Sequence, residues 1–310
     1  MSGLPIRTIH RDHHHFGWDN SLPPVVTVAP GDELEFEIVD ASGGQLTAAS
    51  TAADVAAIDF GKVNPVTGPV YIDGAQPGDT LVVDILGFSG GGWGWTAIIP
   101  GFGLLADDFP EAHINISKYD REGVEFAPGI RLPYRPFTGT IGVALAEPGV
   151  HSVVPPRRVG GNMDIRDLVA GSRLYLPVEV PGALFSVGDT HAAQGDGEVC
   201  GTAIETALKV HLRFSLIKQA NYRFPRFETP TEASPDGGKG YFVTTGIGPD
   251  LMQGAKDATR EMIDYLMKEH GMDAAMAYML CSVAAHLRIS EVVDMPNWVV
   301  SMYLPKAIFG

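Results

Sequence analysis

The chain of 310 residues is poor in cysteine and in basic residues, and it has no long apolar run. Only Cys200 and Cys281 are present, too few for a disulfide framework, so we expect a reducing, cytoplasmic setting. The 37 Asp and Glu outnumber the 22 Lys and Arg, and the net charge of −15 argues against a nucleic-acid partner or an anionic membrane surface. No run of about 18 apolar residues offers a membrane helix, so we expect no membrane partner.

Several catalytic motifs are also absent from the sequence. There is no Gly-x-Ser-x-Gly elbow, no Walker phosphate loop and no His-Glu-x-x-His motif, so the mechanisms built on them have no support. We expect no organic cofactor. A chain of this length buries a large core without disulfide or metal staples. It is therefore expected to form one domain over residues 1–310, or two closely packed subdomains that meet near residues 150–160.

Three segments share a β-rich run, a break containing Pro and Gly, and a second β-rich run: 25–39, 70–86 and 174–187. In the first, Leu34, Phe36 and Ile38 alternate with glutamates, the period of two of a half-buried strand. We predict that the two runs of each segment form antiparallel pairs, and that residues 139–145 form a further strand. The predicted fold is mainly β, a β-sandwich or barrel-like core of antiparallel hairpins.

Helix signals occur only late in the chain. Asp250 is placed to cap a helix that ends near Gly271, and Asp273 to cap a second helix that runs through Ala285. The prediction is a helical pair near the C-terminus, which makes the fold α+β, followed by closing strands at 287–293 and 298–303. The polar segment 227–240 is predicted to be an exposed linker.

Residues 188–205 hold one imidazole, four carboxylates and a thiol among glycines. If a strand continues into this segment, Asp189 and His191 share one face and can converge on one ion, and Glu198 follows after a Gly-rich turn. A set of His and carboxylate ligands suits Zn²⁺, Mn²⁺ or Fe²⁺, and a set richer in oxygen suits Ca²⁺ or Mg²⁺. The alternative is a solvated, charged loop.

A second cluster follows Gly160-Gly161. Asn162 and Asp164 again share a spacing of two, so an extended backbone aims both side chains the same way. Asp164 is a candidate ligand and Asn162 a candidate for orienting substrate. The alternative is a Gly-Gly turn that leads to a capping Asp, which is the favoured interpretation for Asp167.

Other candidates have competing interpretations. Of the adjacent His13, His14 and His15, at most two can face one site, and packing is favoured for each. Trp18 suits either a pocket wall or a core. The aromatic-rich stretch 93–102 suits a core or a subunit contact better than a narrowed pocket.

We predict different roles for the two cysteine side chains. Cys200 is a candidate nucleophile with His191 as its base, or a pocket wall. A thiolate between the acidic Glu198 and Glu205 would meet like charge, which disfavours the nucleophile. Cys281 lies in an apolar helical stretch and is predicted to be in the core.

These clusters, in this order, resemble the acetamidase/formamidase family of amide hydrolases. The pieces that carry the resemblance are Phe16-Gly17-Trp18-Asp19-Asn20, three Pro-Gly-Asp or Gly-Pro-Val-Tyr segments at 30–32, 68–71 and 77–79, Gly160-Gly161-Asn162-Met163-Asp164, the Gly-Asp-x-His and Gly-Asp-Gly-Glu pair within 188–201, and Leu287-Arg288-Ile289-Ser290. One departure is His286, because the family often has an acidic residue there.

The resemblance implies a β-rich fold, a homo-oligomer, and metal-assisted hydrolysis of formamide or acetamide to ammonia and a carboxylate. Our hypothesis assigns Asp164, Asp189 and His191 as ligands of a divalent metal, zinc or calcium, and Glu198 as the base for water. Asn162 holds the substrate amide, Trp18 and Cys200 are substrate-binding candidates, and Glu205 is an orienting residue or alternative ligand. The competing hypothesis is a non-catalytic β-sandwich module that binds calcium and a ligand.

Overall fold

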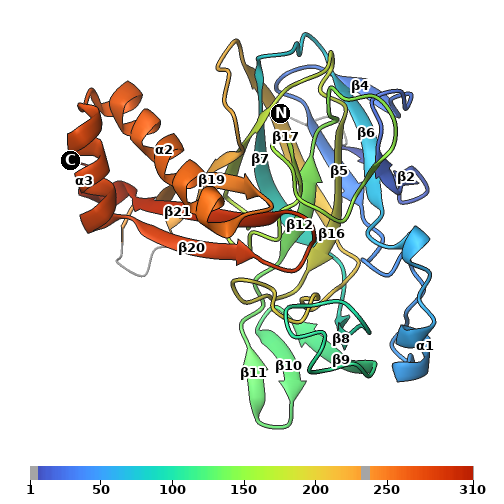
Figure 1. Cartoon of the computed structure of the whole chain (residues 1–310). Coiled ribbons are helices and arrows are strands. Elements are labelled where there is room, and N and C mark those ends of the chain that lie inside the picture. The colour runs from blue at the N-terminus through green and yellow to red at the C-terminus, as the bar shows by residue number, and fades with distance from the viewer. Residues whose placement is uncertain (1–5, 232–237, 310) are drawn as a thin grey trace.

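The computed structural model describes residues 6–231 and 238–309. Strands outweigh helices in this chain, and a lobe of two helices lies on one side (Figure 1), so the predicted, mainly β fold class is confirmed. The nine-stranded sheet has the order β1 (Arg7–Ile9), β5 (Glu33–Glu37), β17 (Lys209–Ile217), β7 (Thr80–Ser89), β15 (Arg173–Pro177), β18 (Arg226–Glu228), β19 (Tyr241–Gly248), β21 (Trp298–Pro305) and β20 (His286–Glu291).

Three smaller sheets complete the β structure. The six-stranded sheet has the order β14 (Gly160–Asn162), β12 (Phe137–Gly142), β16 (Phe185–His191), β6 (Val66–Ile72) and β2 (His14–His15), and β4 (Val26–Val28) pairs with β6. The four-stranded sheet contains β11 (Ile130–Leu132), β10 (Gly123–Ala127), β9 (His113–Asp120) and β8 (Trp93–Ile98), and a small sheet joins β13 (His151–Ser152) to β3 (Gly17–Trp18). The β12 strand confirms the one predicted over 139–145.

The nine-stranded and six-stranded sheets pack face to face around the main core. Phe185 of β16 makes edge-to-face contacts with Phe36 of β5 and Phe214 of β17, with ring centroids 5.8 and 5.0 Å apart. Apolar side chains alternate along these strands, so that Leu34 and Phe36 are buried while the glutamates between them are half-buried. This burial of one face of each sheet accounts for the period of two in the sequence.

The Pro-Gly breaks connect the two sheets instead of forming hairpins. The prediction that the two runs of each segment pair with each other is wrong, because β6 and β7 lie in different sheets, as do β15 and β16. Likewise β4 pairs in parallel with β6, whereas β5 pairs with β17 and β1. Each break is long enough to carry the chain across the sandwich, and a period-two pattern does not specify which strand is the partner.

The C-terminal helices form where the capping residues predict them. Helix α2 (Leu251–His270) begins after Asp250, whose side chain accepts a hydrogen bond from Gln253 N, and ends at Gly271 with φ of 65°. Helix α3 (Ala274–Ala284) begins after Asp273 in the same way, and Cys281 is buried as predicted. The closing strands β20 and β21 pair antiparallel beside these helices, which confirms both predictions.

One short helix and two 3₁₀ turns lie outside the sheets and the helical lobe. Helix α1 (Ala52–Ala56) and a 3₁₀ turn (Phe60–Lys62) precede β6, and a second 3₁₀ turn (Lys306–Ile308) follows β21. The prediction of an exposed linker at 227–240 is wrong at its start, because Phe227 is buried in β18. Residues 232–237 of the predicted linker lie outside the described part of the chain. Among the described residues, no helix is both long and apolar enough to span a membrane.

Candidate active site

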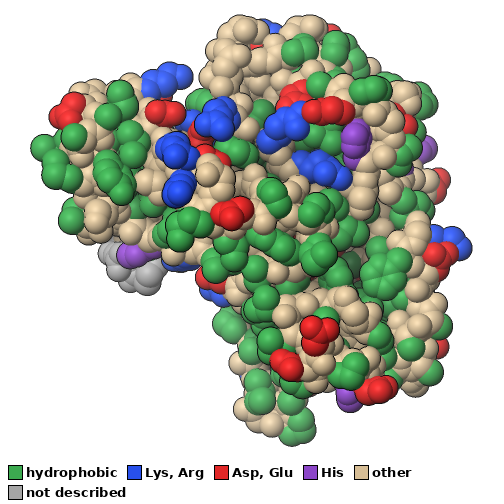
Figure 2. Space-filling view, in the orientation of Figure 1, with side chains coloured by type: hydrophobic (Ala, Val, Ile, Leu, Met, Phe, Trp, Pro, Cys, Tyr) green, Lys and Arg blue, Asp and Glu red, His purple; other side chains and the backbone are tan. Residues whose placement is uncertain are grey.

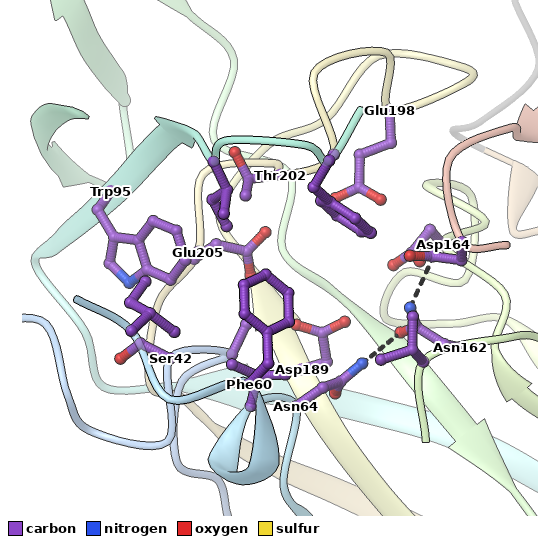
Figure 3. Close-up of a pocket in the computed structure, with 18 residues that line it drawn as sticks. Ser42, Phe60, Asn64, Trp95, Asn162, Asp164, Asp189, Glu198, Thr202 and Glu205 are labelled. Atoms are coloured by element: carbon purple, nitrogen blue, oxygen red, sulfur yellow. Dashed lines mark hydrogen bonds between the residues drawn. The ribbon is translucent and has the colours of Figure 1, made fainter. Parts of the chain in front are cut away.

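The ends of strands β14 and β16 of the six-stranded sheet, and the loop after β16, bring the predicted residues together beside one cavity (Figure 3). Asp189 and His191 end strand β16, and Asn162 and Asp164 follow from strand β14, which lies two strands away across β12. The loop after β16 returns Glu198 and Glu205 to the same cavity. All six side chains are buried, and none is more than 7% exposed.

His191 is the centre of this cluster. Its Nε2 lies 3.1 Å from Asp189 Oδ1 and 3.0 Å from Glu205 Oε2. Its Nδ1 lies 3.0 Å from Gln194 Oε1 and 4.0 Å from Asp164 Oδ1. The imidazole therefore has carboxylates on both sides, with Asp189 and Glu205 at one nitrogen and Asp164 near the other.

A network of side-chain amides and hydroxyls orients Asn162. Its Oδ1 accepts hydrogen bonds from Asn64 Nδ2, at 2.8 Å, and from the hydroxyl of Thr140. Its Nδ2 donates to Asp294 Oδ2 at 2.7 Å. These contacts specify which way the amide of Asn162 faces, and they leave one N–H of Nδ2 for another acceptor.

Three of the acidic residues have a left-handed backbone. The φ angles of Asp164, Asp189 and Glu198 are 45°, 54° and 46°. This conformation is uncommon outside glycine and costs on the order of 1 kcal/mol or more for a residue like Glu, so the surrounding structure has to maintain it. Such strain concentrates at functional sites, and here it turns three carboxylates toward one cavity.

The buried acids have strongly shifted pKa values. Burial and the nearby Asp164 raise the pKa of Glu198 well above its usual value, and burial raises the pKa of Glu205 to about 8. Burial and Asp189 raise the pKa of Asp164 to about 6. Burial disfavours the charged forms of Asp189 and His191 as well, but their mutual attraction lowers the pKa of Asp189 and, together with Glu205, raises that of His191.

The donor set fits a divalent cation. Two groups of three side chains share His191, namely Asp164 with Glu198 and Asp189 with Glu205, and in each group the ligand atoms lie within 4.8 Å of one another. Both carboxylate oxygens of Asp164 are buried without a hydrogen-bond partner in the described part of the chain. Burying carboxylates without compensation is costly, and a cation would supply the missing charge.

Aromatic side chains form part of the cavity wall. Trp95, Phe60 and Phe102 line the cavity, whose volume is about 70 Å³. Trp95 is fixed by a hydrogen bond of 2.7 Å from its Nε1 to Asp40 Oδ2. The stretch 93–102 was expected to be core or subunit contact, and the structure instead places its Trp95 and Phe102 at the cavity as well as in a small apolar cluster.

Two predicted substrate-binding residues lie elsewhere. Trp18 does not line this cavity: it is buried in the sandwich core with its ring edge toward His15, so the pocket-wall interpretation is replaced by the core one. Cys200 lines a neighbouring, outer cavity, and its Sγ lies 3.3 Å from the carbonyl oxygen of Thr202, a contact that leaves His191 uninvolved. Both nitrogens of His191 have other neighbours, so the structure gives no support to Cys200 as a nucleophile activated by that imidazole.

The remaining histidines also lie outside the cavity lining. His15 Nε2 is 2.9 Å from Ser186 Oγ, and His14 Nδ1 is 2.6 Å from Arg11 O. His286 is exposed at the start of β20, where its ring edge faces Tyr241. None of these lines the cavity around His191, and neither does His13.

Sequence reasoning missed four residues that build the site. Asn64, Asp294 and Thr140 orient Asn162, and Gly139 of β12 faces the carboxylates of Asp164 and Asp189. Their contacts join positions as far apart as 98 and 132 residues, so no local spacing indicates them. One cue for Asp294 was available: it directly follows the predicted strand 287–293, which contains the family-like segment Leu287-Arg288-Ile289-Ser290.

Comparison with known proteins identifies a family and several relatives. The sequence pattern of the Acetamidase/Formamidase family matches residues 6–152 and 145–310. A formamidase of Methylophilus methylotrophus is 31% identical over 95% of this chain and 89% of its own length. The crystal structure of an acetamidase from Bacillus halodurans superposes with a TM-score of 0.89 and 31% identity, covering 97% of this chain and 98% of that one. A gamma lactamase from Delftia acidovorans superposes with a TM-score of 0.68 and 32% identity, covering 96% and 89%.

The comparisons show the class of the protein. The alternative of a non-catalytic calcium-binding module is not supported, since the named relatives are amide hydrolases. The family match extends over nearly the whole chain. This chain belongs to the Acetamidase/Formamidase family of amidohydrolases.

Proposed function

We propose that this chain hydrolyses formamide or acetamide to ammonia and the corresponding carboxylate, with water activated at a divalent metal. Relatives named formamidase and acetamidase support the choice of substrates. The observation that carries the proposal is the buried cluster in which His191 has acidic side chains at both ring nitrogens. The cavity of about 70 Å³ suits the smallest amides.

The metal ligands in this proposal are Asp189, His191 and Glu205, with Asp164 as the further carboxylate on the other side of the ring. Asp189 and Glu205 lie near 3 Å from Nε2, whereas Asp164 is 4.0 Å from the nearer ring nitrogen. This revises the ligand set expected from sequence by moving Glu205 into it. A divalent ion there, zinc or calcium, would supply a Lewis acid for the amide carbonyl and would lower the pKa of a water molecule.

Glu198 is the general base and acid of the reaction. Its carboxylate reaches the cavity from the loop beyond β16 and points toward Asp164 (Figure 3). Burial and the neighbouring Asp164 raise the pKa of Glu198 well above its usual value. A carboxylate with a raised pKa holds a proton more readily, so it can take one from water and return it to the leaving nitrogen. An amide needs this proton because its amine is a poor leaving group.

Asn162 positions the substrate. Since Asn64 and Thr140 occupy its oxygen and Asp294 takes one N–H, the free N–H is available to the substrate carbonyl. Trp95, Phe60 and Phe102 keep bulk water from the reacting atoms.

Ammonia release from formamide and acetamide by the purified protein tests the proposed reaction. We expect turnover with both and a decline after the metal is removed. A protein that releases no ammonia from either amide, and that responds to calcium only with a shift in melting temperature, would instead be a binding module.

We also infer a homo-oligomer. Apolar side chains gather over the helical lobe in Figure 2, and Tyr278, Met279 and Val283 of α3 are 62%, 55% and 83% exposed. An apolar patch of this kind is typical of an interface between subunits. Light scattering should give a mass above 33.1 kDa, and Val283→Glu should lower it.

A further inference from the structure

A second, larger cavity adjoins the one around His191. Its volume is about 500 Å³, within the range of small-molecule sites, and Glu198 and Thr202 belong to the linings of both cavities. Thr202 is fixed there by hydrogen bonds of 2.9 Å that its hydroxyl makes with the backbone N–H and C=O of Ala97. The outer cavity therefore begins at the side chain that we propose as the catalytic base.

The lining of the outer cavity is mainly apolar. The hairpin of β10 and β11 supplies Phe126 and Leu132, and the loop after β16 supplies Ala193 and Ile204. These four side chains belong to one apolar cluster. These apolar side chains offer no hydrogen bonds to the amide group of a substrate, but they can bury its alkyl chain away from water.

The charged groups of the outer cavity are already paired. Arg135 Nη2 lies 2.7 Å from Asp167 Oδ1, and Arg166 Nε lies 3.6 Å from Asp196 Oδ1. Each arginine of the lining therefore has a carboxylate beside it, and Glu198 adds a further negative charge at the inner end. The cavity therefore favours a neutral chain over one that ends in a carboxylate.

We propose that the outer cavity binds the alkyl chain of linear amides longer than acetamide, with Leu132 and Phe126 as specificity-determining residues. This inference rests on the proposed amide hydrolysis at the inner cavity. The amide group lies beside Glu198 in the inner cavity, and the chain extends past Glu198 and Thr202 into the outer one. Each buried methylene then raises kcat/KM by about fourfold.

The test measures ammonia release from formamide, acetamide, butyramide and hexanamide by the wild type and two variants. Leu132→Trp fills the outer cavity, and we expect it to lower kcat/KM for hexanamide at least tenfold while changing that for formamide less than twofold. The control is Ile130→Trp, on the same strand, because Ile130 is 50% exposed and outside the lining. Phe126→Ala, which removes contact without adding bulk, should also lower hexanamide turnover selectively.

Several results would overturn the inference. One is a wild type whose kcat/KM does not rise with chain length, and another is an equal effect of Leu132→Trp on all four amides. A five-carbon amide ending in a carboxylate that outperforms hexanamide would show that the arginines bind an anion. If formamide itself gives no ammonia, the proposed function fails first. Melting curves identify a variant that does not fold, in which case Phe126→Ala decides.

Discussion

Gly139 faces Asp164 so closely that a Cβ atom at residue 139 would overlap Asp164 Oδ1. The same Cβ would lie 2.8 Å from Asp189 Oδ2 and 2.9 Å from His191 Cε1, also closer than real contacts allow. The absence of a side chain at the centre of β12 is therefore a condition for the acidic cluster above it.

Gly139→Ala should reduce kcat/KM for formamide about 100-fold, because the added methyl group displaces carboxylates that need sub-ångström placement. Gly87→Ala is the matched control, since Gly87 also lies on a strand, and a Cβ there meets nothing within 4 Å. Steady-state ammonia release compares the two. Equal activities would mean that the cluster tolerates displacement.

Glu198→Gln should reduce turnover about 10² to 10⁴-fold, because it removes the group that moves a proton between water and nitrogen. Stability should be kept or raised, since burial already disfavours the charged form of Glu198. Kinetics and thermal unfolding on the same preparation measure both effects. Glu111→Gln, at an exposed glutamate, is the control and should leave kcat unchanged.

Cys200→Ser should retain more than half of the wild-type kcat. The thiol contacts Thr202 O and lines only the outer cavity, away from the imidazole nitrogens. A loss of two orders of magnitude, or an acyl-enzyme trapped on Cys200 and seen by mass spectrometry, would restore it as a nucleophile.

Glu291 gives a prediction about pH. Burial raises its pKa from 4.5 to about 8, so the folded protein binds its proton more tightly than the unfolded chain does. The contribution of Glu291 to the free energy of unfolding is therefore largest below pH 4.5. It falls by on the order of a few kcal/mol as the pH rises toward 8.

Denaturant unfolding of the metal-free protein at a series of pH values from 5 to about 9 measures this slope. Glu291→Gln has no titrating group at that position, so its stability should fall less over the same range. The account is contradicted if wild type and variant lose stability in parallel.

The sequence predicts those parts of the fold that local chemistry determines. Asp250 and Gly271 mark the ends of α2 because a cap and a left-handed glycine act within one turn. Strand β6 pairs with β16, which lies more than a hundred positions later, and with β4, which lies across a break in the chain. The alternating pattern does not specify either partner. Strand β17 was missed although Val210, Leu212 and Phe214 alternate with polar residues.

The candidate site follows the same division. Asp189 and His191 were predictable because two-residue spacing on one strand aims both side chains together. Asp294 and Asn64 were not, since they reach Asn162 only after the sandwich and the C-terminal lobe have packed. The contact of the Cys200 thiol with Thr202 O was not predicted either.

The most direct test of the central claim measures formamide hydrolysis before and after the metal is stripped and returned. Chelation followed by metal-free dialysis should reduce ammonia release at least 100-fold, and adding back zinc or calcium should restore it. Elemental analysis should find one or more divalent ions per chain in the active protein and fewer in Asp189→Ala. Undiminished hydrolysis by protein that contains no metal would contradict the account.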